Sequence, residues 1–262
     1  MDNFRESLKN RRYKAFVSML GTTQLHLRSP YVIAAWSLAF PGFGHLLLNK
    51  YLRGYALVIW EMFINQLIHL NLAMVHSFNG QFEAAKEVLE PKFMGLYIPV
   101  YLFAIWDSYR TTVDMNRVYL LAQRENAPYN SFDIRALEVN YLDKRKPWIA
   151  AVWSAGIPSV GQLYLHRIVF AVFVLISTII IMGNSNFLLA IHYLILGDIE
   201  SSSAVLDPQW TLYFPSLYFF TIYDAYTNAV ENNKLFNDDI KNFLIRNYQP
   251  AGRRIRLEGK VN

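Results

Sequence analysis

The chain has 262 residues, of which 53% are hydrophobic, 16% are aromatic and only 17% are charged. Soluble domains usually carry about a quarter charged residues, and the apolar residues here gather in long blocks, which indicates a membrane protein. The lack of cysteine excludes a thiolate nucleophile, disulfides and thiolate-ligated metals. The net charge of +5 does not indicate nucleic-acid binding, because the basic residues are not interleaved with stacking aromatic residues.

The first apolar block, residues 31–48, follows a basic segment at residues 1–29 and contains a break. Pro41, Gly42 and Gly44 lie in its second half. Glycine permits positive φ and close backbone approach, so we expect a turn at this point. The alternative is that the turn exposes backbone groups to an ion or a lipid headgroup.

The second block, residues 54–77, is long enough to cross a bilayer as one helix. Four polar residues in it follow at intervals of four, four and seven, which places them on one stripe of such a helix: Glu61, Asn65, His69 and His76. One interpretation is hydrogen bonding between helices. The other is a proton relay, a solute path or a metal site that uses Glu61 and His69.

The third block, residues 93–109, has only about fourteen largely apolar residues before Asp107, which cover roughly 21 Å of a ~30 Å hydrocarbon core. If this helix spans the membrane, Asp107 lies near the inner edge of the bilayer. A carboxylate in that position is costly to bury and is therefore a functional candidate.

The sequence matches itself when it is shifted by 117 residues. Residues 30–37 fall on residues 147–154, and Trp106-Asp107-Ser108-Tyr109 falls on Tyr223-Asp224-Ala225-Tyr226 at the same offset. We infer a tandem duplication, and we call residues 30–116 copy one and residues 147–233 copy two. A basic link at residues 117–146 joins the copies, and a polar, basic tail at residues 234–262 follows them.

The shift separates residues that both copies keep from residues that one copy alone has. The break recurs in copy two at Pro158 and Gly161. Both copies keep an acidic and a basic residue, namely Asp107 with Lys50 and Asp224 with Arg167. We expect two ion pairs, Lys50–Asp107 and Arg167–Asp224, that hold the break in place; a proton or ion site is the alternative. The polar stripe of the second block is not kept, because its positions in copy two hold Thr178, Met182, Asn186 and Tyr193.

The distribution of basic residues predicts the topology. Six Lys and Arg residues precede the first block, seven lie in residues 110–146 and seven follow Tyr226, whereas residues 197–209 contain none. Under the positive-inside rule, all three basic segments are cytoplasmic, and each copy therefore crosses the membrane an even number of times. We predict that the first block of each copy is a re-entrant or broken hairpin followed by two spanning helices. Three full crossings per copy, as in transporters built from inverted repeats, remain the alternative.

The sequence Pro-Gly-Phe-Gly-His-Leu-Leu-Leu-Asn-Lys at residues 41–50 resembles the turn of the small two-transmembrane-helix domain family. Residues 158–165 are similar, and Trp106-Asp107 and Tyr223-Asp224 resemble the aromatic-Asp pair that closes that domain. Copy one departs from the motif at Leu47, where an aromatic residue is usual, and copy two departs at Ser159, where glycine is usual. The resemblance implies residence in a membrane and two membrane helices per domain.

Together these patterns predict an all-α, multi-pass protein of the cell (inner) membrane with two tandem modules and both termini in the cytoplasm. No catalytic residue, cofactor or metal site is predicted. The expected partners are the lipid bilayer, anionic headgroups, and another membrane protein or a second copy of the chain. The leading hypothesis for function is a non-enzymatic assembly factor or membrane subunit of a larger complex. A small transporter or channel that uses the intramembrane polar residues is the second hypothesis, and a membrane enzyme of unknown chemistry is the third.

Overall fold

A computed structural model describes residues 12–248 of the chain. The prediction of a mostly helical protein is confirmed. The basic residues before Arg12 and those beyond Tyr248, which the sequence assigns to the cytoplasmic side, lie outside the described residues.

The helices form two series along the chain. The first series is α2 (Pro30–Ala39), α3 (Phe43–Leu47), α4 (Tyr51–Ile68), α5 (Leu70–Phe78), α6 (Phe82–Val88) and α7 (Pro91–Arg124). The second series is α8 (Pro147–Gly156), α9 (Val160–Tyr164), α10 (Ile168–Asn184), α11 (Phe187–Ile195), α12 (Ile199–Ala204), α13 (Pro208–Thr211) and α14 (Tyr213–Tyr248). Helices α2, α3, α4, α5 and α6 begin 117 residues before α8, α9, α10, α11 and α12, respectively.

The first apolar block of copy one forms two short helices. Helix α2 begins with Pro30 at its first position, where the missing N–H is not needed, and ends before an extended Phe40. Helix α3 then folds back and packs closely on α2. This close approach requires glycine at position 44, because a Cβ atom there would collide with Ser37 and with the carbonyl of Ile33. Copy two repeats this arrangement, with Gly161 against Ser154 and Ala150.

The second apolar block of each copy is bent, which corrects the prediction of one straight helix. His69 adopts a left-handed conformation between α4 and α5, and Asn186 does so between α10 and α11. The two bends measure 66° and 63°, and α6 meets α7 at 93°. Within residues 12–248 no single helix combines the length and hydropathy of a membrane span, but these three bent pairs do so jointly.

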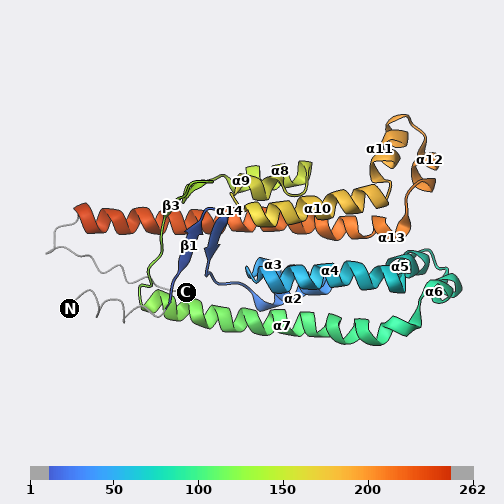
Figure 1. Ribbon diagram of the computed structural model, residues 1–262, viewed down its shortest axis with the longest axis horizontal. Coiled ribbons are helices and arrows are strands. Elements are labelled where there is room, and N and C mark those ends of the chain that lie inside the picture. Colours follow the sequence, from blue (N-terminus) through green and yellow to red (C-terminus); the bar gives the residue numbers. More distant parts are fainter. Residues whose placement is uncertain (1–11, 249–262) are drawn as a thin grey trace.

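Two short antiparallel hairpins were not predicted. Strands β1 (Ala15–Ser18) and β2 (Gly21–Gln24) form the first, and β3 (Phe132–Ile134) and β4 (Val139–Tyr141) form the second. Figure 1 shows the first hairpin between the long helices α7 and α14, and the second hairpin beside it on the α14 side. The hairpins contact each other through β1, which packs against β3 and β4.

The main hydrophobic core lies between the two copies. Phe43 of α3 stacks on Phe220 of α14 with ring centroids 4.0 Å apart, and Trp36 of α2 packs on the same Phe220. Val58 of α4 and Val174 of α10 belong to the same buried cluster. Helices α7 and α14 run along the long axis of the molecule with this core between them (Figure 1).

Candidate functional site

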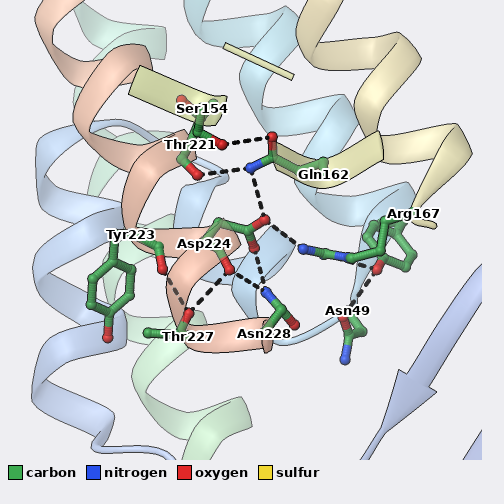
Figure 2. A network of polar contacts seen from close by, with 10 residues as sticks. Asn49, Ser154, Gln162, Arg167, Thr221, Tyr223, Asp224, Thr227 and Asn228 are labelled. Carbon is green, nitrogen blue, oxygen red and sulfur yellow. Dashed lines mark hydrogen bonds and ion pairs between the residues drawn. The ribbon is translucent and has the colours of Figure 1, made fainter. Parts of the chain in front are cut away.

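Asp224 on α14 is the centre of a buried polar network in copy two, shown in Figure 2. Arg167 donates from Nη1 to Asp224 Oδ2 over 2.5 Å, and Gln162 donates from Nε2 to the same oxygen over 3.3 Å. Asn228, one turn further along α14, donates to Asp224 Oδ1 over 2.8 Å. The Arg167 and Asp224 side chains are 3% and 0% exposed, so this ion pair is sealed from solvent.

The turn between α9 and α10 places Arg167 in this network. His166 adopts a left-handed conformation, and Arg167 is the N-cap residue of α10. The Arg167 guanidinium lies 4.7 Å from the Phe170 ring centroid and donates to the Tyr51 hydroxyl of copy one over 3.1 Å. The pair in copy two therefore also contributes to the contact between the copies.

The first hairpin covers this turn. His166 Nε2 lies 2.9 Å from the Met19 carbonyl, and the Ile168 N–H donates to the Leu20 carbonyl over 3.1 Å. A Cβ atom at Gly21 would come close to the backbone of His166 and Arg167. The N-terminal hairpin thus lies directly over the turn that carries the cation of copy two.

The matching site of copy one, around Asp107 on α7, is more open. His45 Nε2 lies 2.9 Å from Asp107 Oδ2, where Gln162 stands in copy two. Arg53 donates to Asp107 Oδ2 over 2.5 Å, and the two side chains are 52% and 12% exposed. Its cation is therefore half in water, unlike Arg167.

The predicted partner of Asp107 was wrong, whereas the predicted partner of Asp224 is the observed one. Lys50 is exposed and makes no ion pair with Asp107; Arg53, in the first turn of α4, takes its place. Lys50 lies just outside α4 as its N-cap residue, whereas Arg53 lies within the helix and reaches Asp107 of α7. In both copies a cation next to the break binds the carboxylate of the long helix, which ties the broken hairpin to that helix.

The residues of the breaks make tight turns against neighbouring helices. Gly42 has φ of 100°, and a Cβ atom there would collide with the Gly54 carbonyl and with Val58. Ser159 holds the same φ of 100° in copy two, which strains a residue with a side chain. Pro41 and Pro158 come directly before these positions. The close backbone packing leaves no space at Gly42 or Gly44 for a ligand.

A second polar cluster lies around Glu61 of α4, which is 4% exposed. Its Oε1 accepts from Tyr97 and from Asn65, each over 3.2 Å. Gln209 of copy two donates to Asn65 Oδ1 over 2.9 Å, and Asn71 of α5 donates to the Gln209 carbonyl over 2.9 Å. The cluster therefore joins the α4–α5 break to α13. Glu61 Oε2 has no hydrogen-bond partner among the described residues.

The predicted polar stripe is only partly assembled. Glu61 and Asn65 share the cluster, but the bend at His69 leaves the His69 side chain exposed. His76 lies on α5 and interacts with Gln81 over 2.8 Å, away from Glu61. A continuous path of these four residues along one helix is therefore wrong, because two helices of different direction carry them.

Sequence reasoning missed several members of both sites. His45 and Gln162 occupy matching positions in the two apolar blocks, and that shared polarity was a usable signal. Arg53 and Gln209 gave no such signal, because neither is kept at the 117-residue offset. Their roles depend on how the helices pack.

The chain was compared with protein-family models, curated proteins and solved structures, and no match was found in any of the three. The resemblance to the small two-transmembrane-helix family therefore stays a prediction.

Proposed function

We propose that the chain is an integral protein of the cell (inner) membrane in which two tandem modules each contribute a re-entrant hairpin and two spanning helices. Large exposed apolar side chains on the helices of the bent pairs support this, for example Leu96 and Leu102 on α7 and Ile176 and Ile179 on α10. Such a surface is costly in water and is favourable in lipid. The basic link and both basic ends then lie in the cytoplasm.

Matching contacts at the 117-residue offset support the duplication. Tyr101 donates to the Leu38 carbonyl in copy one, and Tyr218 donates to the Ala155 carbonyl in copy two. The equivalence of these contacts is one reason to retain the two-transmembrane-helix family as the proposed relationship.

A second pair of contacts lies at the entry to each copy. Asn116 of α7 bonds the backbone N–H and C=O of Arg28 over 3.0 and 2.8 Å. Asn233 of α14 bonds the same groups of Arg145 over 2.9 and 2.7 Å. Both asparagines hold the segment that leads into the first short helix of their copy, which further supports a repeated module.

Within this membrane protein, we propose a non-enzymatic role as an assembly factor or membrane subunit of a larger complex. The observation that carries this proposal is an apolar stripe at the end of α14. Ile240, Phe243, Leu244 and Tyr248 are exposed and follow at intervals of three, one and four residues, which places them on one helix face. Ile240 lies about 24 Å along the helix from Asp224, so the stripe is outside the proposed membrane region.

An apolar helix face in water is a recognised mode of docking onto another protein. The ion pairs at Asp107 and Asp224 agree with a structural role, because cations of the same chain occupy both carboxylates. The described residues contain no cluster of three or more metal-ligating side chains.

Crosslinking and purification from native membranes tests this role. The double substitution Phe243→Ser and Leu244→Ser should abolish co-purification of a stoichiometric partner, and Asn242→Ser, on the opposite face of the helix, should leave it intact. A complex that survives the double substitution, or a chain that purifies alone before any substitution, would contradict the proposal.

Glu61 favours a second candidate function, a small transporter or channel. Glu61 is near the middle of α4, about 15 Å from its start, and one carboxyl oxygen lacks a partner. An intramembrane carboxyl group without a counter-cation is a candidate site for a proton or a monovalent cation. Proteoliposomes with the wild-type chain should then pass protons or Na⁺, and Glu61→Gln should stop the flux. Equal flux through protein-free vesicles and through vesicles that contain the wild-type chain would contradict this candidate function.

A further inference from the structure

The second hairpin turns its apolar face away from the protein. Four exposed residues alternate along its strands, and Leu137, in the turn between them, is 82% exposed. The four are Phe132 and Ile134 on β3 and Val139 and Tyr141 on β4. Phe132 and Tyr141 are cross-strand partners with ring centroids 6.2 Å apart, so the face carries a stacked aromatic pair.

The inward face of the same hairpin is polar. Asn140 is buried and donates to the Ser18 carbonyl of the first hairpin over 2.7 Å. Asp133 is half-buried and pairs with Arg135 over 3.1 Å. A hairpin on a soluble protein normally packs its apolar face inward and turns its polar face to water. The second hairpin has the reverse polarity.

The first hairpin, which lies 117 residues earlier, does not expose the matching face. Ala15, Val17 and Gln24, which precede Phe132, Ile134 and Tyr141 by 117 residues, are all buried. Gln24 donates to Asn232 of α14 over 2.7 Å, so the long helix of copy two covers this face. Within residues 12–248 no such helix covers the equivalent face of the second hairpin, and its residues there are larger and more apolar.

We propose that the outward face of the β3–β4 hairpin lies in the headgroup region of the cytoplasmic leaflet and anchors the link between the copies to an anionic lipid surface. The inference rests on the proposal that the chain spans the membrane. Only five residues separate Tyr141 from α8, the first apolar helix of copy two, so the hairpin lies within about 20 Å of the start of that helix. A membrane that receives α8 therefore passes close to the hairpin.

The residues between the hairpin and α8 suit an interface between water and lipid. Lys144 and Lys146 are exposed and make no ion pair within residues 12–248, whereas Arg145 is paired with Asp143. Trp148, in the first turn of α8, is exposed. Tyrosine and tryptophan prefer the headgroup level, and lysines near it are attracted to anionic lipids. Between residues 132 and 148, Glu138 in the hairpin turn is the one acidic residue without an ion pair in the described part of the chain, because Asp133 and Asp143 are paired with arginines.

A second copy of the chain fits this face less well. Five partly exposed side chains fall short of the roughly 800 Å² that each partner contributes to a stable protein interface. A lipid surface needs no complementary shape, and it accepts a small apolar patch flanked by cations.

The absence of cysteine from the chain permits a direct test. Leu137→Cys removes a side chain that is almost fully in solvent, so the fold is retained, and the new thiol is labelled with an environment-sensitive fluorophore. The labelled full-length chain is reconstituted into vesicles of phosphatidylglycerol and phosphatidylcholine, with nitroxides attached to the lipid headgroups or to the upper acyl chains. Two matched positions serve as references: Leu102→Cys on the apolar part of α7 and Gln123→Cys at its cytoplasmic end.

We expect lipid nitroxides to quench the Leu137 label several-fold more than the Gln123 label, and iodide in the water to quench it less. In vesicles made of phosphatidylcholine alone, quenching of the Leu137 label by the lipid nitroxides should be weaker. A Leu137 label that matches Gln123 would overturn the proposal. Self-quenching between labelled chains without lipid quenching would assign the face to a second copy and would also overturn it. Quenching at Leu102 tests the membrane span separately, so the two proposals fail independently.

Discussion

The two copies place an equivalent carboxylate, each paired with an arginine, in two different environments. Asp224 and Arg167 are sealed beneath the first hairpin, whereas Asp107 binds an Arg53 that is half in water. The sequence-equivalent neighbours differ as well, since His45 in copy one stands where Gln162 stands in copy two. The carboxylate is therefore common to both copies. The position of the arginine that binds it, and the exposure of that arginine to water, depend on what covers the break.

The largest expected effect is the loss of the sealed carboxylate. Asp224→Asn leaves the Arg167 guanidinium buried without its counter-charge, which should cost about 3–5 kcal/mol of stability. Asp107→Asn should cost far less through its ion pair, about 1 kcal/mol or below, because water solvates Arg53. Thermal unfolding of the two variants in the same detergent measures the difference. Equal losses would show that the two sites are equivalent.

The next effect concerns the turn that both copies share. Gly42→Ala adds a Cβ atom at φ of 100° against the Gly54 carbonyl and should cost about 2 kcal/mol or more. Ser159→Gly relieves the same conformation in copy two and should stabilise the chain by about 1 kcal/mol. The signs are opposite, and the unfolding midpoints of the two variants check them. A destabilising Ser159→Gly would mean that the Ser159 side chain has a role the backbone does not explain.

A smaller effect distinguishes the observed cation of copy one from the predicted one. Arg53→Gln should reduce stability by up to about 1 kcal/mol, and Lys50→Gln should change it by less than about 0.5 kcal/mol. The same unfolding assay serves, with the salt concentration raised to confirm that the Arg53 contribution is screened. A loss of stability in Lys50→Gln but not in Arg53→Gln would show that Lys50, and not Arg53, is the partner of Asp107.

The last expected effect is nearly absent at neutral pH and grows on acidification. Burial, together with the charges of Arg28 and Lys234, lowers the pKa of His26 to about 3. Between that value and the unfolded value of 6.5 the unfolded chain binds a proton that the folded chain does not, so stability falls as the pH falls through this window. His26→Asn should make the unfolding midpoint less dependent on pH between 7 and 5. An unchanged slope would show that His26 titrates normally in the folded protein.

The repeat predicted more of the site than any single motif did. The 117-residue shift paired Asp107 with Asp224 and identified Arg167 as a partner, because these residues sit at equivalent positions of each copy. It misassigned Lys50, because sequence equivalence does not fix which of two nearby cations faces α7. The bends at His69 and Asn186 escaped prediction because neither carries a proline or glycine signal; histidine and asparagine adopt the left-handed conformation without one.

The hairpins escaped prediction for a different reason. Their strands are three or four residues long, too short for alternation to stand out from a basic, mixed segment. The reversed polarity of the second hairpin could not be predicted either, because alternation along a strand does not show which of its faces points to the protein. The Glu61 cluster depended on Gln209, which reaches Asn65 only when the two copies pack together.

The central claim is that each copy crosses the membrane an even number of times, so that both ends and the link share one side. Single cysteines in the otherwise cysteine-free chain test it, at Asn79 and Ser203 in the two acidic loops, at Gln123 in the link and at Asn247 near the end of α14. Intact cells are treated with a membrane-impermeant maleimide before and after permeabilisation. The proposal predicts labelling of Asn79→Cys and Ser203→Cys in intact cells, and of Gln123→Cys and Asn247→Cys only after permeabilisation. Labelling of Gln123→Cys in intact cells, with Asn247→Cys still protected, would establish an odd number of crossings and contradict it.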